Sequence, residues 1–396
     1  MLFWIRKHLA RPAIALLSAT LIWTWLPAPA SAAPDFVGTS AEAAALIDVA
    51  SGRILVSVNG DKQMRIASLT KIMTAIVAIE HGKLSDLVSV SSSAAGKEGS
   101  SIYLRAGQEM SLEHLLYGLM LRSGNDAATA IAEHVGGSLE GFVYLMNEKA
   151  KSLGLTGTQF KNPHGLDEEG HYSTANDVAK MTAYALKNPV FREIVKTKTK
   201  RVPNPDGEWD YTWYNKNRML SLYEGADGVK TGYTKLAKRC LVSSATRGGQ
   251  QLAAVTLNAP DDWADHTKLL NYGFSNYPLV PLVSKGDRLE GMPAVAGRSF
   301  AYPLGEKEKD SVRKEAVLLD PSSFAYALGE RGTLQFTLNG EKIGSVPLYA
   351  PDSRQLSVQE RSAFSFRQSA VYEAEGFELW NRHFKNLFRR LFVLND

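Results

Sequence analysis

ASLTKIMTAIVAIE, residues 67–80, sets a serine and a lysine three positions apart at the start of a nearly continuous apolar run. As a helix, this run would carry bulky apolar groups around most of its circumference, which predicts a helix buried on nearly all sides. These groups belong to Ile72, Met73, Ile76, Val77 and Ile79. Other elements of the fold must therefore surround this helix.

Ser68 and Lys71 have the spacing that makes two side chains face the same way on a helix. The serine falls at the helix start, where free N–H groups and the helix dipole favour developing negative charge. A lysine among apolar neighbours has a lowered pKa, and its neutral amine can take the proton of a nearby hydroxyl. The pair thus predicts an activated serine nucleophile. The alternative is an N-cap serine beside a snorkelling lysine.

Strand patterns stand on both sides of a helical middle. Residues 42–58 predict two strands joined by a turn at Ala50-Ser51-Gly52. Helices are predicted at 111–121, 126–136 and 139–154, and strands return over 228–259. If the early and late strands share one mainly antiparallel sheet with helices packed on it, residues 33–277 form an α+β domain.

Beyond residue 277 the pattern changes to short alternating strands with Gly, Pro and Asn-Gly turns, so residues 278–358 predict a small β-rich domain. Residues 359–396 then predict a linker and an amphipathic helix. Within 377–394, aromatic and leucine side chains follow a three-four spacing and arginines and a lysine supply positive charge. Such a helix suits the surface of an anionic membrane, and docking on the protein itself or on a partner is the alternative.

Residues 1–32 have the three parts of a secretory signal peptide: a basic start, an apolar run and a small-residue end. The apolar run is shorter than a membrane-spanning helix requires, and an uncleaved anchor is the alternative. We therefore expect an exported protein at the outer face of the cytoplasmic membrane or in the cell wall, bound peripherally.

Composition excludes several classes. A formal charge of +4 on 396 residues is small and dispersed, which does not indicate a nucleic-acid partner. The single cysteine, Cys240, allows no intrachain disulfide, and its apolar surroundings predict a buried strand residue. No H-E-x-x-H motif occurs, and His164 and His171 in a polar loop are interpreted as structural. We expect no metal and no cofactor.

The S-x-x-K pair is followed by S-x-N at residues 123–125 and K-T-G at residues 230–232. Alone, S-x-N is a good helix-cap turn and K-T-G is an ordinary strand segment. In this order the three are the signature of the serine penicillin-recognising enzymes. Segments such as LLYGLMLRSGNDAATAIAEHVGGS, FKNPHGLD and GVKTGYTKLAKRCLVSSATR resemble the low-molecular-mass D-alanyl-D-alanine carboxypeptidases, over about residues 38–277. This resemblance implies a β-lactamase/transpeptidase-like domain, an antiparallel sheet with helices on both faces, then a β-rich domain and a membrane-binding tail.

The resemblance also implies site roles, residue by residue. Ser68 would be the acylated nucleophile, Lys71 its general base and Ser123 a proton relay. The substrate-binding residues would be Asn125, Lys230, Thr231, Gly232 and Tyr233. Within this set, Lys230 and Thr231 would bind the terminal carboxylate. The backbone N–H groups of Ser68 and Tyr233 would form the oxyanion hole.

The implied reaction removes the last D-alanine from a peptidoglycan stem peptide ending in D-Ala-D-Ala, with β-lactams as inhibitors; endopeptidase activity on cross-links and a role in sporulation stay open. Two positions depart from the family pattern. Lys216 stands where many relatives have arginine, and Lys238 where glycine is frequent. A substrate-binding role for Lys216 and the shape of the site's mouth are therefore open.

Two rival functions remain. A class A β-lactamase shares the three motifs but normally has S-D-N and a glutamate-activated water, whereas Gly124 stands at the middle position here. Glu168 and Glu169 in the polar loop keep that rival open. The third hypothesis is a non-catalytic peptidoglycan-binding scaffold, which the intact motifs disfavour.

Overall fold

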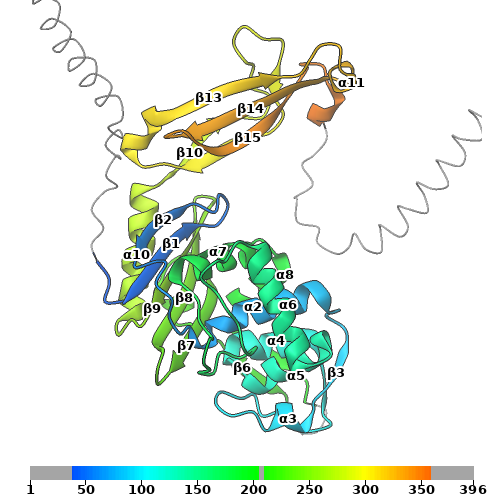
Figure 1. The fold of residues 1–396 in the computed structure, drawn as a ribbon, viewed down its shortest axis with the longest axis vertical. Coiled ribbons are helices and arrows are strands. Elements are labelled where there is room, and N and C mark those ends of the chain that lie inside the picture. Colours follow the sequence, from blue (N-terminus) through cyan, green and yellow to red (C-terminus); the bar gives the residue numbers. More distant parts are fainter. Residues whose placement is uncertain (1–37, 205–208, 358–396) are drawn as a thin grey trace, which may run out of the picture.

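The structure, a computed structural model, describes residues 38–204 and 209–357 (Figure 1). The predicted signal peptide, residues 1–32, and the predicted C-terminal helix, residues 377–394, lie outside this part of the chain. In the described ranges, every helix is too short or too polar to cross a membrane.

A five-stranded antiparallel sheet joins the two ends of the first domain (Figure 1). Its order is β2 (Ile54–Val58), β1 (Ala43–Asp48), β9 (Gln250–Leu257), β8 (Lys238–Arg247) and β7 (Ala226–Thr234). The register pairs Ala45 with Ser57 on one side and with Val255 on the other. The prediction that early and late strands share one sheet is therefore confirmed.

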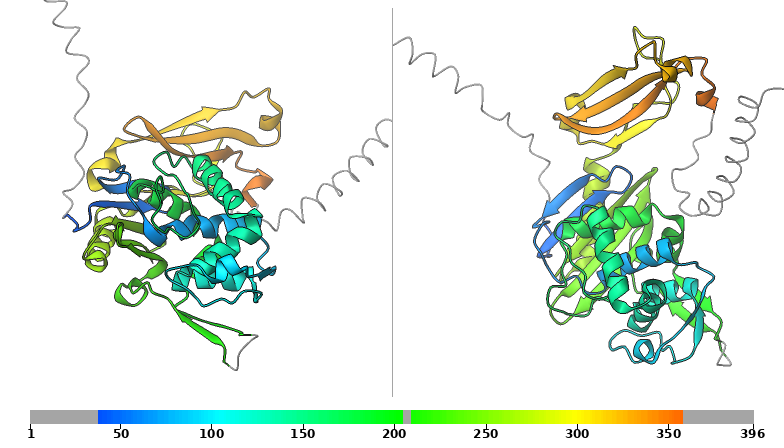
Figure 2. Two further views of the ribbon diagram at one scale, coloured as in Figure 1. Left: turned by 60° about the horizontal axis from the view of Figure 1, so that its bottom comes forward. Right: turned by 45° about the vertical axis from the view of Figure 1, so that its right-hand side comes forward.

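Helices cover both faces of this sheet (Figures 1 and 2). One face carries α2 (Lys71–His81), α4 (Leu112–Tyr117), α5 (Asn125–Gly136), α6 (Leu139–Ser152), α7 (Ala175–Leu186) and α8 (Pro189–Lys196). The other face carries α10 (Asp262–Asn276), whose Leu269 and Leu270 pack with Leu46 of β1. Helix α2 is buried along nearly its whole length, as its sequence predicts, and the α+β prediction is confirmed.

Two short hairpins lie at the helical end of the domain. Strand β3 (Leu87–Ser89) pairs with β4 (Glu109–Ser111), and β5 (Thr199–Val202) with β6 (Tyr211–Tyr214). The second hairpin projects from the molecule (Figure 2) and packs at its base against the π-helical turn Gly118–Arg122. Neither of these strand pairs was predicted from the sequence, and nor were the helices α7, α8 and α10.

Residues after 277 form smaller sheets with their own core (Figure 1). Strand β10 (Leu279–Val283) pairs with β12 (Phe300–Pro303). A four-stranded sheet has the order β11 (Val295–Ala296), β15 (Glu341–Tyr349), β14 (Glu330–Leu338) and β13 (Val312–Leu318). The β14–β15 turn has positive φ at Asn339 (51°) and Gly340 (86°), the geometry for which an Asn-Gly pair is suited.

One arginine joins the two sheet systems. Arg53, just before β2, donates to the carbonyl of Pro303 (2.6 Å) and forms an ion pair with Glu308. Its guanidinium also lies 5.4 Å from the ring centroid of Tyr277 and 5.5 Å from that of Tyr302. Burial disfavours the charged Glu308 carboxylate, but the Arg53 hydrogen bond and charge prevail and lower its pKa. The β-rich part is thus fixed to the β1–β2 turn.

Candidate active site

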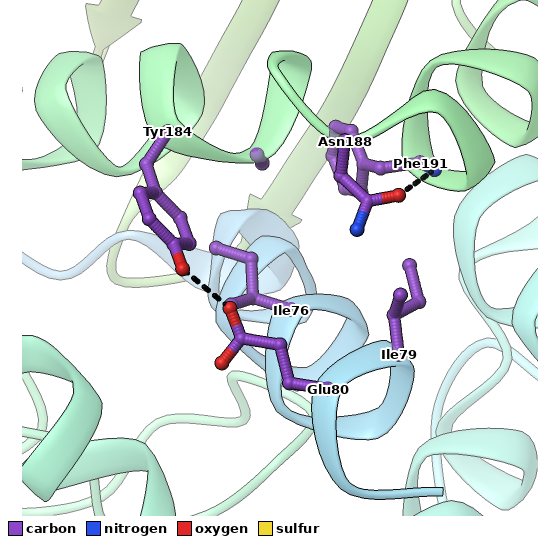
Figure 3. A pocket seen from close by; sticks show the side chains of 7 residues that line it. Ile76, Ile79, Glu80, Tyr184, Asn188 and Phe191 are labelled. Carbon is purple, nitrogen blue, oxygen red and sulfur yellow. Dashed lines mark hydrogen bonds between the residues drawn. The ribbon is translucent and has the colours of Figure 1, made fainter. Parts of the chain in front are cut away.

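Two hollows of very different size flank helix α2. The smaller lies between α2 and the helices α7 and α8, among the apolar side chains of Ile76, Ile79 and Phe191 (Figure 3). The Tyr184 hydroxyl donates to Glu80 across it (2.6 Å). Its volume of ≈ 20 Å³ accommodates about one water molecule, so it belongs to the helix packing and not to a substrate.

The larger hollow, of ≈ 400 Å³, lies where the start of α2 meets the edge strand β7. Its lining includes Ser68, Ser100, Ser123, Lys216, Thr231, Gly232, Tyr233, Arg239, Asp262 and Trp263. The structure therefore brings the three separate sequence motifs to one pocket. Asn125, Lys71 and Lys230 are buried directly beneath it.

Ser68 lies in the 3₁₀ turn Ala67–Thr70, immediately before α2. The prediction put it at the helix start, and the tighter turn instead leads into the helix. Ala67 has a left-handed φ of 47°, a conformation that alanine adopts only when neighbours hold it there. Those neighbours are two glycines: a Cβ on Gly165 would lie 1.9 Å from the Ala67 carbonyl oxygen, and one on Gly232 3.1 Å from the Ser68 amide.

Lys71 is fully buried, and its amine makes three hydrogen bonds. Its Nζ lies 3.1 Å from Ser68 Oγ, 2.7 Å from Asn125 Oδ1 and 2.6 Å from the His164 carbonyl oxygen. Burial, followed by the positive charges of Lys230 and Lys216, lowers the pKa of Lys71 well below that of an ordinary lysine. A lysine amine of lowered pKa is thereby held next to the serine hydroxyl.

The S-x-N motif enters the pocket from a helix junction. Ser123 ends the π-helical turn with a left-handed φ of 66° and is 5% exposed. Asn125 starts α5, and its amide nitrogen donates to the Glu98 carbonyl (2.7 Å) while its oxygen accepts from Lys71. The buried carboxylate of Asp126 accepts from the Ile102 amide (3.0 Å) and others of that loop, which fixes the wall beside Ser100.

The K-T-G motif forms the opposite wall. Lys230 is buried, and its Nζ donates to the Thr231 carbonyl (2.6 Å). Burial, and then the charge of Lys216, lower the pKa of Lys230 to about 7. Thr231 and Gly232 face the pocket, and the Tyr233 ring at its mouth is 64% exposed.

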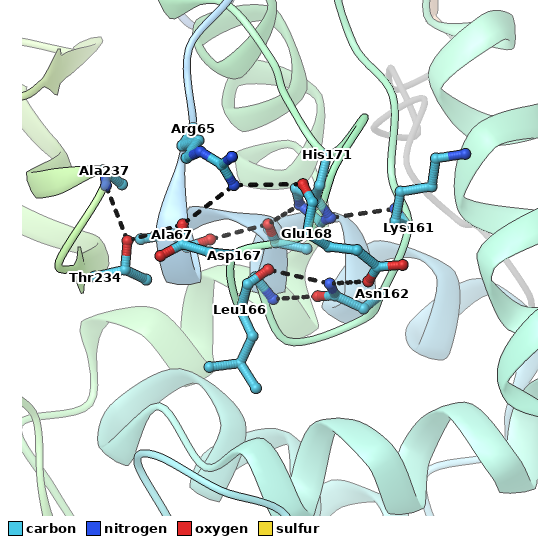
Figure 4. Close-up of polar contacts among 12 residues, drawn as sticks. Arg65, Ala67, Lys161, Asn162, Leu166, Asp167, Glu168, His171, Thr234 and Ala237 are labelled. Atoms are coloured by element: carbon cyan, nitrogen blue, oxygen red, sulfur yellow. Dashed lines mark hydrogen bonds and ion pairs between the residues drawn. The ribbon is translucent and has the colours of Figure 1, made fainter.

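The loop of residues 161–171 packs against the turn that carries Ser68, near Arg65 and Ala67 (Figure 4). Asp167 accepts a hydrogen bond from Thr234 at the end of β7 (3.1 Å) and lies 3.6 Å from the Arg65 guanidinium. His171 Nε2 lies 2.8 Å from Thr70 Oγ1. Burial lowers the pKa of His171 to about 4 and that of His164 to about 2, so both rings are neutral at pH 7 and serve as fixed hydrogen-bond partners.

Lys216 and Arg239 both line the pocket and supply cations to it. Lys216 Nζ donates to Ser100 Oγ (3.3 Å), which brings the position that the sequence left open into the site. Arg239 binds Asp262 through Nη2 (2.5 Å) and Nε (3.2 Å). Arg239 was not predicted from the sequence as a site residue, although the β7–β8 turn places it opposite Tyr233. Nothing in the sequence pointed to Asp262, because the helix α10 that begins with it was not predicted.

Cys240 is 1% exposed in β8, and burial raises the pKa of its thiol to about 12. This confirms the prediction of a buried strand residue. In residues 38–204 and 209–357, no group of histidine, cysteine and carboxylate side chains is arranged to hold a metal ion.

A family model described as D-alanyl-D-alanine carboxypeptidase (peptidase S11) matches residues 29–261. The D-alanyl-D-alanine carboxypeptidase DacF of Bacillus subtilis (strain 168) is 38% identical over 335 residues, covering 79% of this chain and 85% of the relative. DacC of Escherichia coli (strain K12) is 36% identical over 335 residues, covering 76% and 81%.

Solved structures agree with these relatives. The crystal structure of the D-alanyl-D-alanine carboxypeptidase DacD from Francisella tularensis has a TM-score of 0.63 at 26% identity, covering 83% of this chain and 96% of that one. A mutant of the Streptomyces K15 DD-transpeptidase has a TM-score of 0.57 at 35% identity, covering 60% and 99%. The likeness thus extends from the family motifs to the arrangement of the whole domain.

Proposed function

The chain belongs to the peptidase S11 family of D-alanyl-D-alanine carboxypeptidases, and we propose that it removes the terminal D-alanine of peptidoglycan stem peptides through an acyl-enzyme on Ser68. As a family member it is a serine hydrolase of the cell-wall carboxypeptidase class. The observation that carries the assignment of Ser68 is the buried Lys71 amine, of lowered pKa, at 3.1 Å from Ser68 Oγ.

In the proposed acylation, Ser68 Oγ attacks the carbonyl carbon of the penultimate D-alanine while the neutral Lys71 amine takes the hydroxyl proton. The backbone N–H groups of Ser68 and Tyr233 stabilise the oxyanion of the tetrahedral intermediate. The C–N bond then breaks, and a proton delivered through Ser123 lets D-alanine leave as the amine. Water attacks the Ser68 ester in the same site, which releases the shortened peptide and restores the hydroxyl.

The lowered pKa values of Lys71 and Lys230 predict how this reaction depends on pH. Lys71 acts as the neutral amine, so kcat/KM rises as pH increases through its lowered pKa. Lys230 favours the substrate carboxylate only when charged, and it loses its proton as pH rises through about 7. We expect a bell-shaped profile that falls above pH ~7. The check is to repeat the profile with Lys230→Arg, which stays charged; an unchanged alkaline limb would contradict this role.

Lys230 is 1% exposed and hydrogen-bonded to the strand, so its charge would act on the substrate carboxylate from beneath the pocket, and direct contact with the carboxylate needs a second, accessible cation. We propose that Arg239 supplies it. Arg239 lies across the β7–β8 pair from Tyr233, on the wall that holds Thr231. Arg239 donates from Nε and Nη2 to the Asp262 carboxylate, which fixes the plane of the guanidinium. The remaining nitrogen, Nη1, would donate to a carboxylate oxygen of the substrate.

Replacing Arg239 with glutamine is expected to lower kcat/KM for a D-Ala-D-Ala peptide about ten- to a hundredfold, the size of one charge-assisted pair. A thioester substrate whose leaving group lacks a carboxylate should be hydrolysed at the wild-type rate, because that substrate has no group for Arg239. Lys235→Gln removes an exposed cation close to the site and is the matched control. Equal losses on both substrates would contradict carboxylate binding.

The proposed function itself is tested by incubating the purified chain with a D-Ala-D-Ala-terminated peptide and measuring free D-alanine, with and without benzylpenicillin. We expect release that stops with the antibiotic, together with an intact mass increased by one penicilloyl group. Penicillin hydrolysis without D-alanine release would instead favour the β-lactamase rival.

The β-lactamase rival also needs a carboxylate that activates water for deacylation. Of the described residues lining the pocket, Asp262 is the one carboxylate, and Arg239 binds it. Glu168 binds Asn162 Nδ2 (2.8 Å) in the loop behind Ser68 and does not line the pocket. This arrangement favours the carboxypeptidase.

We propose that residues 1–32 direct export and that residues 377–394 hold the enzyme at the outer face of the cytoplasmic membrane. In this proposal residues 33–277 form the catalytic domain and residues 278–358 the β-rich domain, and the catalytic domain reaches into the wall.

A further inference from the structure

The exposed large apolar side chains of the β-rich part gather at one of its ends. They are Val317, Leu318, Phe324 and Leu328, which we call the apolar tip. Phe324 is 79% exposed and Leu328 56%. Beyond residue 277, these are the described large hydrophobics that stand out into solvent. Single exposed apolar residues are common, but a cluster at one end of a domain indicates a contact surface.

The tip is rigidly built. Val317 and Leu318 end strand β13, where Leu318 pairs with Gly332 of β14. Phe324 begins the short helix α11 (Phe324–Ala327; Figure 1), and the Ser323 hydroxyl oxygen caps this helix by accepting from the Tyr326 amide. Leu328 donates its amide to the Phe324 carbonyl (3.1 Å), which places the two side chains one turn apart. Their exposure is therefore held by the backbone and does not depend on a loose loop.

The described chain also ends at this tip. The Ala350 amide donates to the Gly329 carbonyl (2.8 Å), next to Leu328, and a Cβ on Gly329 would lie 3.0 Å from Ser353 Oγ. The last described turn, Arg354–Ser357, follows directly. The described chain therefore ends beside the apolar tip, and the sequence that follows residue 357 includes the amphipathic, cationic stretch 377–394.

We propose that the apolar tip rests on the same lipid surface as residues 377–394, as a second and independent contact with the membrane. One weak anchor gives reversible binding, and stable attachment takes two. The charges near the tip are mixed, with Asp320 and Glu330 beside Arg331 and Arg354. The tip therefore adds apolar burial and no electrostatic attraction, whereas the cations of residues 377–394 add mainly charge.

The double variant Phe324→Ser/Leu328→Ser in the full-length chain tests this proposal by co-sedimentation with vesicles. We expect its partition coefficient to fall about a hundredfold or more, as burial of two large apolar side chains implies, and by the same factor on zwitterionic and anionic vesicles. Arg389→Gln/Arg390→Gln should weaken binding only on anionic vesicles. The control Tyr144→Ser/Leu222→Ser removes two equally exposed apolar side chains from the first domain and should bind as wild type.

A second measurement does not depend on the stability of the double variant. Residues 377–394 contain Trp380, so this test uses a full-length chain that carries Trp380→Phe. Adding Phe324→Trp to that chain should add quenching by brominated lipids, because the new indole would lie at the acyl boundary. Absence of quenching, or wild-type partition of the serine variant, would overturn the proposal. So would faster proteolysis of residues 358–396 in solution in the serine variant, since that result would mean that the tip binds the tail. D-alanine release from a soluble peptide should stay unchanged, which keeps this test separate from that of the enzymatic function.

Discussion

Ser68→Ala is expected to abolish D-alanine release, with a loss of kcat of roughly a million-fold, as when the nucleophile of a serine hydrolase is removed. No covalent bond to the peptide can form without Oγ, and water would have to attack the amide directly. Benzylpenicillin should leave the intact mass of this variant unchanged. The fold should persist, because the serine is half-buried and its Oγ has one described partner, Lys71.

Ser221→Ala, an exposed serine of the short helix α9 (Met219–Leu222), is the matched control and should retain full activity. The same experiment addresses the scaffold hypothesis. If Ser68→Ala restored the phenotype of a strain lacking the gene as well as the wild type does, the catalytic assignment would be wrong and the protein would act by binding alone.

Lys71→Met is expected to lower the rate of acylation by both peptide and penicillin about a thousandfold, within the range for losing a general base. Methionine fills similar volume in the buried site but accepts no proton. Lys71→Arg should be equally inactive, because a guanidinium stays protonated, and this pair of variants separates proton transfer from mere charge. Intact mass against time measures acylation directly.

Lys83 is exposed beyond the end of α2, and Lys83→Met is the control for the loss of a lysine. Thermal unfolding checks that each Lys71 variant is folded, since the Asn125 and His164 oxygens lose a donor. An active, folded Lys71→Arg enzyme would show that another group removes the Ser68 proton.

The fold was predicted well from the sequence where apolar periodicity was strong. Burial of α2 followed from Ile72, Met73 and Val77, and the shared sheet followed from strand patterns at both ends of the domain. The helices α7 and α10 were missed because polar residues interrupt their apolar faces. The β5–β6 hairpin was missed because its strands are four residues each and pack on a helix junction instead of the main sheet.

The motif residues of the site were predicted by their order along the chain, and the structure brings them to one pocket. Their supports were not predicted, because each support joins residues far apart in sequence. One loop without apolar periodicity supplies two of these supports. Its His164 carbonyl accepts a hydrogen bond from Lys71, and its Asp167 carboxylate accepts one from Thr234. Arg239 escaped notice because its role depends on Asp262, which packing of α10 brings to the sheet.

The position of β1 has a consequence for how the chain reaches this structure. The strand lies between β2 and β9, with Ala45 facing Val255. During N-to-C synthesis, the first hairpin must wait for the last strand of the domain before its second edge is paired. Such distant pairing makes folding slow and leaves an apolar strand open to aggregation in the interval. A truncated chain that stops before residue 250 would therefore be a substrate for chaperones and proteases, and not a smaller working unit.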